Sequence, residues 1–345
     1  MSTSANSNSK SWLRRWGIPY AVLILILIEV GASRQDWLWS TEPRSNTGIV
    51  YALEDRVIEV ADDPAIVFMG SSRVRDAVAP RVMEQQLNLP TGSVLNLGLS
   101  EGSVFDSLTL YERNRRKLSG AELLVVGVEL NDFVAVPIVN NRFRRFAPLS
   151  MRLEWQGPER LSLVLGWLYR TYDARPNLRA LVSSIWRQNS PEIPIAEDGR
   201  VVWREPVEDG PNRIDAALAA ETLYAGEEAG LGFEGELQEL VDLATADGMH
   251  VAIVHVPVRD SVADAFDANF SDLVEEMQGS VTAISGASLV DITMRRSSVS
   301  GLEPTHYEDY GHVTPDGGLV LTAYYGELLG EAFSADLEAS RARTG

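Results

Sequence analysis

The 345-residue sequence predicts an α/β fold built on a parallel sheet with helices on both faces. Short apolar runs at residues 65–69, 93–99 and 123–130 have the length of buried strands. Stretches with helical spacing at residues 80–87 and 105–118 separate these runs. Strands that alternate with helices pair in parallel, because each helix carries the chain back to the same end of the sheet.

The composition of the chain excludes several classes of function. With 49 acidic and 30 basic side chains the net charge is −19, so nucleic acid is not an expected partner. The absence of cysteine excludes disulfides, cysteine nucleophiles and thiolate metal sites. The 4 histidines are scattered without the spacing of metal ligands. We therefore expect neither a metal nor another cofactor.

An apolar segment near the N-terminus has the character of a membrane anchor. Residues 16–32 are apolar except for Glu29 and are preceded by a basic tail. A helix of that length spans about 25 Å, close to the ~30 Å hydrocarbon core of a bilayer. Because basic flanks stay in the cytoplasm, we predict a single-pass membrane protein with a cytoplasmic tail at 1–15 and an extracytoplasmic body. Residues 30–32 also fit a signal-peptidase site, so a cleaved signal peptide is the alternative.

The body of the chain divides into a main domain and an insertion. Residues 33–63 are predicted to form a polar linker and a short helix that lead into the main domain, residues 64–333. The alternation of strands and helices stops after the third strand. We interpret residues 133–215 as a helical insertion into the main domain, and residues 334–345 as a tail.

The α/β pattern returns in the second half of the chain. A helical stretch at residues 216–246 precedes a strand at 250–258. A helix at 262–277 then leads to a short strand at 288–292. The closing helix, at 315–333, begins at a Thr-Pro-Asp sequence that is typical of a helix start.

Polar residues that can perform chemistry follow several of the predicted strands. Parallel strands place their carboxyl ends at one edge of the sheet, so we expect these residues to gather there. Taken singly, each also fits an ordinary turn, strand end, helix cap or surface pair. Their shared position at strand ends favours a common site. The residues are Ser71, Ser72, Asn96, Gly98, Asn131, Asp309 and His312.

Serine, histidine and aspartate are the residue types of an acyl-transfer site. Ser72 would attack an ester carbonyl, and His312 would take the serine proton and later return it to the leaving alcohol. Asp309, three residues before His312, would orient the imidazole. The sequence therefore predicts a catalytic triad of Ser72, His312 and Asp309.

Four short blocks of the sequence resemble those of the SGNH, or GDSL, hydrolase superfamily and occur in the order of that family. They are Gly70-Ser71-Ser72, Asn96-Leu97-Gly98, Asn131 and Asp309-x-x-His312. The family nucleophile is the third residue of Gly-Asp-Ser, which corresponds to Ser72, and Ser71 stands where the aspartate is usual. The resemblance covers residues 65–132 and 250–330. It implies a three-layer, flavodoxin-like sheet domain that carries a helical insertion and follows the transmembrane helix.

The resemblance also assigns the groups that stabilise the tetrahedral oxyanion. These are the backbone N–H groups of Ser72 and Gly98 and the side-chain amide of Asn131. A glycine at position 98 would let the substrate approach the backbone closely. Loss of one such donor typically costs about 100-fold or more in rate.

Gly-Ser-Ser together with an N-terminal anchor is similar to the branch that includes D-alanyl transfer proteins of lipoteichoic acid synthesis and alginate acetylation proteins. The resemblance implies a membrane-anchored, extracytoplasmic serine esterase that acts on O-acyl esters of a glycan, a lipid or a small molecule. An O-acyltransferase for cell-envelope polysaccharide, working with a membrane-embedded acyltransferase, would use the same acyl-enzyme. A third alternative is a non-catalytic binding or assembly protein, which Ser71 and the insertion leave open.

Overall fold

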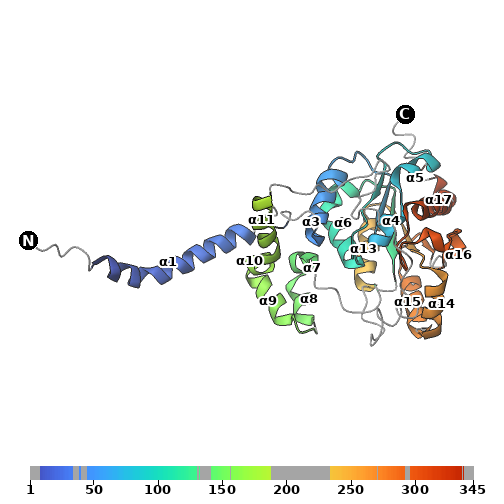
Figure 1. Cartoon of the computed structure of the whole chain (residues 1–345). Helices are drawn as coiled ribbons and strands as arrows, with labels where there is room; N and C mark the ends of the chain where they lie inside the picture. The colour runs from blue at the N-terminus through green and yellow to red at the C-terminus, as the bar shows by residue number, and fades with distance from the viewer. Residues whose placement is uncertain are drawn as a thin grey trace, which may run out of the picture. The chain divides into compact units, whose positions relative to one another are not determined.

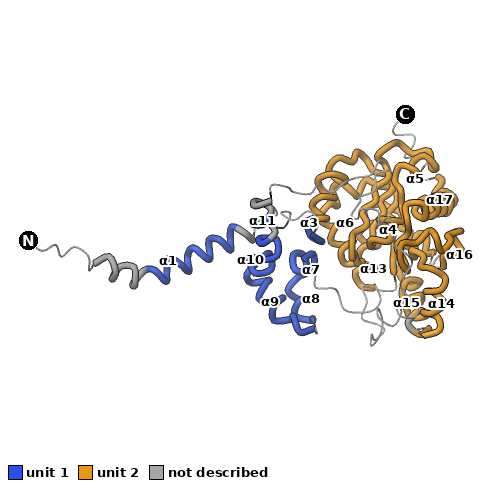
Figure 2. Tube along the Cα trace, in the orientation of Figure 1, with its two compact units in different colours: residues 1–48, 139–191 blue, residues 49–138, 192–345 orange. Residues whose placement is uncertain are grey.

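The computed structural model divides the chain into two compact units, coloured separately in Figure 2. One unit combines residues 1–48 with 139–191, and the other combines residues 49–138 with 192–345. Residues 139–191 of the predicted insertion thus group with the N-terminal segment, and the remainder of the insertion groups with the unit that contains the sheet. The structure describes residues 8–33, 39, 45–129, 132, 141–155, 157–187, 234–269, 271–291, 296–335 and 337.

The larger unit confirms the predicted α/β class and the parallel sheet. Within the described residues, five parallel strands lie in the order β2-β1-β3-β4-β5. All residues of β1, β2 and β3 are buried, which explains why these segments are unbroken apolar runs in the sequence. The strands are β1 (Ile66–Met69), β2 (Val94–Asn96), β3 (Leu123–Val128), β4 (His250–His255) and β5 (Leu289–Asp291).

Helices pack on both sides of this sheet (Figure 1). On one side α17 packs against α4 and α5, and on the other α6 packs against α13. The principal helices are α4 (Ser72–Ala77), α5 (Pro80–Leu87), α6 (Val104–Leu118), α13 (Glu234–Ala246), α14 (Asp260–Asn269), α15 (Ser271–Ala283) and α17 (Pro315–Ala332). The shorter elements are α3 (Asn46–Leu53), the π-helical η1 (Glu54–Ile58), α16 (Ser297–Ser300) and the 3₁₀ turn η4 (Pro304–His306).

Several predicted boundaries differ from the structure. The helix predicted at 262–277 is wrong in extent, because two helices, α14 and α15, cover that region. The helix α4 was not predicted, since six residues are too few to display an apolar period. The predicted strand at 93–99 is shorter in the structure, where β2 ends at Asn96. Residues 216–233 of the predicted helix at 216–246 lie outside the described residues.

The order of the strands determines where a site can form. The chain runs from β1 outward to β2 and then returns to β3 on the other side of β1. In a parallel sheet the loops diverge at such a reversal and leave a crevice at the carboxyl ends of the two strands. The segment that begins at Gly70 follows β1, and Glu129 follows β3. These two segments therefore start side by side at the reversal point.

The smaller unit is helical in its described part. A buried ion pair between Arg152 and Asp173, 2.7 Å apart, lies inside this unit. No helix among the described residues combines the length and the hydropathy that a membrane crossing needs. The anchor at residues 16–32 stays a prediction. The helices are α1 (Asn8–Ser33), α7 (Asn141–Phe146), α8 (Leu149–Glu154), α9 (Arg160–Leu168), α10 (Arg170–Asp173) and α11 (Arg175–Arg187).

The turn from β1 into α4 depends on glycine at position 70. Gly70 has φ +147°, and a Cβ there would lie 2.6 Å from Cγ2 of Val74 and 2.7 Å from the carbonyl oxygen of Gly127. We expect Gly70→Ala to lower the free energy of unfolding by about 2–4 kcal/mol, through backbone strain and overpacking. Denaturant titration measures this loss. Gly279→Ala is the matched control, because a Cβ at Gly279 in α15 would meet no atom within 4 Å. Equal stability of the two variants would contradict this account.

Candidate active site

Ser72 occupies the first helical position after β1. Ser71 caps α4, and its hydroxyl oxygen accepts a hydrogen bond from the backbone N–H of Arg73 at 3.0 Å. The cap begins the helix immediately after the strand and leaves Ser72 partly exposed. The backbone N–H of Ser72 lies in the first turn, where a helix offers no internal acceptor. The nucleophile predicted from the sequence therefore stands at the carboxyl edge of the sheet.

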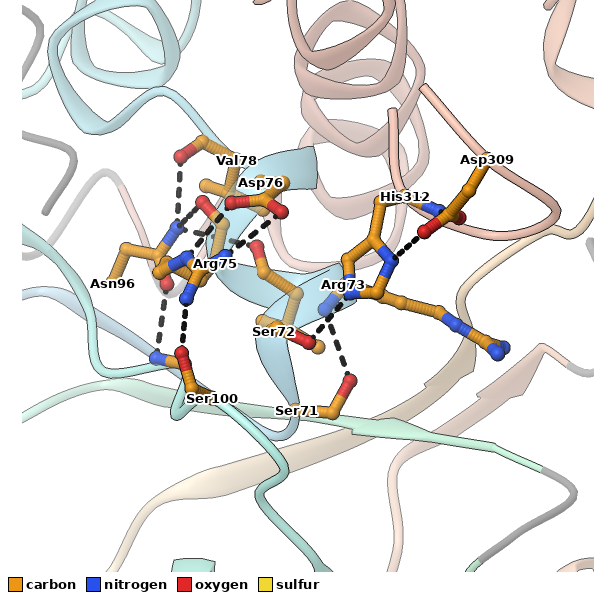
Figure 3. A network of polar contacts seen from close by, with 12 residues as sticks. Ser71, Ser72, Arg73, Arg75, Asp76, Val78, Asn96, Ser100, Asp309 and His312 are labelled. Atoms are coloured by element: carbon orange, nitrogen blue, oxygen red, sulfur yellow. Dashed lines mark hydrogen bonds and ion pairs between the residues drawn. The ribbon is translucent and has the colours of Figure 1, made fainter. Parts of the chain in front are cut away.

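The structure brings Ser72, His312 and Asp309 together (Figure 3). The hydroxyl oxygen of Ser72 lies 2.7 Å from Nε2 of His312, and Nδ1 of His312 lies 2.8 Å from Oδ2 of Asp309. The His312 and Asp309 side chains are 15% and 24% exposed, so the group is accessible from solvent. These are the contacts of an acyl-transfer triad, with the base held between a nucleophile and an orienting carboxylate.

Asp309 is held by its own loop. Its second oxygen, Oδ1, accepts the backbone N–H of Gly311 at 2.9 Å and of His312 at 2.8 Å. Burial raises the pKa of Asp309, but the hydrogen bond and charge of His312 and the two backbone N–H groups outweigh it, so the pKa lies well below its usual range. An ionised Asp309 accepts a hydrogen bond from Nδ1–H of His312, which leaves Nε2 as the acceptor for the hydroxyl hydrogen of Ser72.

Asn96 fixes the far end of α4. Its side-chain Nδ2 donates to the carbonyl oxygens of Val74, Arg75 and Val78, at 3.2, 3.0 and 2.8 Å. Asn96 is buried, so its amide satisfies carbonyl groups that water does not reach. Asn96 therefore supports the helix that carries Ser72 and has no direct contact with the triad that the structure records.

Gly98, one of the predicted oxyanion donors, packs against α4. The N–H of Gly98 donates to Oδ1 of Asn96 at 3.1 Å. A Cβ on Gly98 would lie 2.4 Å from the backbone nitrogen of Arg75, so packing against α4 requires glycine at this position. Asn131, the third predicted donor, lies outside the described residues.

Glu129 is a buried residue beside the triad that sequence reasoning missed. It follows β3, accepts the hydroxyl hydrogen of Ser71 and forms an ion pair with Arg73 at 3.2 Å. The Arg73 guanidinium also lies 5.0 Å from the ring centre of Tyr310 and packs against Gly311, where a Cβ would come within 2.6 Å of its Nε. Arg73 and Glu129 therefore link the segments after β1 and β3 with the loop that carries His312.

The network continues from Glu129 to Asp132. The carboxylate of Asp132 accepts the backbone N–H of Glu129 at 2.8 Å and that of Val104, at the start of α6, at 3.2 Å. Burial, followed by the nearby charge of Glu129, raises the pKa of Asp132 to about 8.

Glu129 could have been identified from the sequence, because it is an acidic residue directly after an apolar strand.

Among the described residues, no three histidine, aspartate or glutamate side chains cluster in a way that would hold a metal ion.

No model of a known protein family matches the chain, and no curated protein matches it.

The ion pair of Glu129 with Arg73 is buried, with both side chains 7% exposed. We expect Glu129→Gln to lower the free energy of unfolding by about 3 kcal/mol, because it removes the carboxylate charge that faces the buried Arg73 guanidinium. Denaturant titration measures the loss. The control is Glu59→Gln at the exposed pair with Lys117, where we expect less than about 0.5 kcal/mol. A loss at Glu129 as small as that at Glu59 would refute the structural role of this pair.

The depressed pKa of Asp309 predicts a pH-dependent contribution to stability. Because the folded pKa lies below the unfolded value of about 4, ionised Asp309 stabilises the fold above that value, and the stabilisation is lost as the pH falls through the folded pKa. We expect the stability difference between the wild type and Asp309→Asn to shrink from about pH 5 to about pH 2. Denaturant titrations across this range measure the difference, and a constant value would contradict the assignment.

Proposed function

We propose that the protein is an SGNH-type serine esterase that cleaves O-acyl esters through an acyl-enzyme on Ser72. The observation that carries the proposal is the chain of hydrogen bonds from Ser72 through His312 to Asp309. It lies at the carboxyl edge of a parallel sheet, beside the reversal of strand order, where α/β proteins commonly bind ligands.

The two halves of the reaction use the same proton carrier. In the first, the Ser72 oxygen attacks the ester carbonyl carbon while Nε2 of His312 takes the hydroxyl proton, and the departing alkoxide recovers that proton as an alcohol. In the second, His312 takes a proton from water, which attacks the acyl carbon. The carboxylic acid leaves, and His312 returns the proton to Ser72. Asp309 remains ionised and stabilises the imidazolium in both halves.

The oxyanion requires donors that point at the attacked carbonyl oxygen. The N–H of Ser72 is suited to this because it belongs to the nucleophile itself and lies in the first turn of α4. We assign the second donor to the side-chain amide of Asn131, on the resemblance to SGNH hydrolases alone. Gly98 is left out of this set because its N–H is engaged by Asn96.

We further propose that α1 anchors the protein and that the catalytic unit is extracytoplasmic. The proposal rests on the apolar run at 16–32, the basic tail before it and the exposure of the α1 side chains from Val22 to Ile28. Substrates would then be acylated glycans, lipids or small esters of the cell envelope. The His312 and Asp309 side chains are 15% and 24% exposed, so water can reach the triad as an acceptor.

Covalent labelling of the full-length protein in detergent with a fluorophosphonate probe tests the nucleophile. We expect an adduct on Ser72 that is absent from Ser72→Ala, because the probe reacts with serines activated by a neighbouring base. His312→Gln should slow labelling at least about 100-fold through loss of that base. Peptide mass spectrometry locates the adduct.

The matched control for the base is His306→Gln, since His306 accepts the backbone N–H of Glu303 and has no recorded contact with Ser72. This variant should label at the wild-type rate. A folded wild-type protein without an adduct would overturn the esterase proposal and favour the non-catalytic alternative.

A further inference from the structure

The outward face of α9 is apolar. Leu161, Leu165 and Leu168 are 70%, 38% and 56% exposed, and their spacing places them along one side of the helix. The opposite side carries Leu163 and Gly166, which are buried in the unit. A surface helix of a water-soluble unit normally shows polar residues on its outer side. The exposed leucines of α9 therefore indicate that this side of the helix contacts an apolar environment and not water.

Aromatic and basic residues border the leucine stripe. Trp167, Tyr169 and Tyr172 are exposed at the end of α9 and in α10. Arg160 and Arg179 are also exposed, at the start of α9 and in α11. Tryptophan and tyrosine favour the boundary between hydrocarbon and headgroups, and arginine favours the phosphates of that boundary.

The stripe belongs to the same unit as α1 and is joined to it through Glu29. The Glu29 carboxylate accepts the backbone N–H of Arg170, and also the N–H of Thr171 at 3.2 Å and its hydroxyl hydrogen at 2.6 Å. These bonds satisfy the one charge of the apolar run at the start of α10. Figure 2 shows α1 ending at α10 within this unit. The apolar surface of α1 therefore continues towards α10 and α9.

The exposed side chains of α1 indicate whether protein or lipid covers the apolar surface of this unit. Seven consecutive side chains, Val22 to Ile28, are exposed, so the apolar surface encircles the helix. A protein partner or a second copy docked on one side would leave the other sides in water, whereas a lipid phase covers all of them. Glu159, the exposed acid next to α9, is paired with Arg144 at 2.5 Å. The observations favour lipid.

We propose that α9 and α10 lie on the bilayer that holds α1, with Leu161, Leu165 and Leu168 in contact with lipid at the level of the headgroups. The proposal rests on the membrane anchor proposed above. It makes the insertion an interfacial platform, in which a short amphipathic helix lies in the plane of the membrane surface. The occupant is a phospholipid surface.

The absence of cysteine makes the chain a ready template for single spin labels. Full-length variants Leu161→Cys and Leu168→Cys are labelled and reconstituted into vesicles of phosphatidylethanolamine and phosphatidylglycerol. Val60→Cys is the matched control, because Val60 is an equally exposed apolar residue, at 71%, in the other unit. Ile24→Cys reports on the anchor. For each spin label, the relaxation caused by oxygen, which concentrates in lipid, is compared with the relaxation caused by a water-soluble nickel chelate.

We expect oxygen to relax the labels at 161 and 168 more than the nickel chelate does, and the reverse at 60. A water-exposed signal at 161 and 168 with a lipid signal at 24 overturns the platform and leaves the anchor standing. Lipid signals at 161 and 168 with water at 24 would refute the anchor, and with it the proposal that α9 and α10 lie on the bilayer that holds α1. Low accessibility to both reagents at 161 and 168 means that protein covers the stripe, and this also overturns the proposal.

Discussion

The 2.7 Å hydrogen bond between Ser72 and His312 joins two positions that are 240 residues apart in the chain, and much of the larger unit serves to hold them there. The reversal of strand order beside β1 places Ser72 and Glu129 at one edge of the sheet. Arg73 then ties that edge to the loop of His312 through Glu129 and Tyr310. The alignment of nucleophile and base thus depends on a buried ion pair one residue away from the nucleophile.

The sequence predicted those features that depend on local composition. Strands buried on both faces are continuous apolar runs, so the parallel sheet was evident, as was the pairing of Asp309 with His312 at short range. Contacts that depend on distant partners were missed. Glu129 gains its importance from Arg73 on a neighbouring strand connection, and Gly98 is glycine because the backbone of Arg75 lies against it. Neither contact leaves a periodic signal in the chain.

Buried charges are paired in both units. In the larger unit Glu129 holds Arg73, and Asp309, which is 24% exposed, orients His312. In the helical unit Asp173 pairs with Arg152 and Glu29 accepts hydrogen bonds at the start of α10, while leucines of α9 lie on the outside. We infer that the larger unit carries out ester chemistry and that the helical unit contacts lipid.

The most direct test of the central claim is to trap the acyl-enzyme itself. The full-length protein is incubated with p-nitrophenyl acetate, quenched in acid during turnover and analysed by peptide mass spectrometry. The account predicts an acetyl group on Ser72 that disappears as the substrate is consumed. Release of p-nitrophenol without acetylated Ser72, or acetylation confined to another residue, would contradict it.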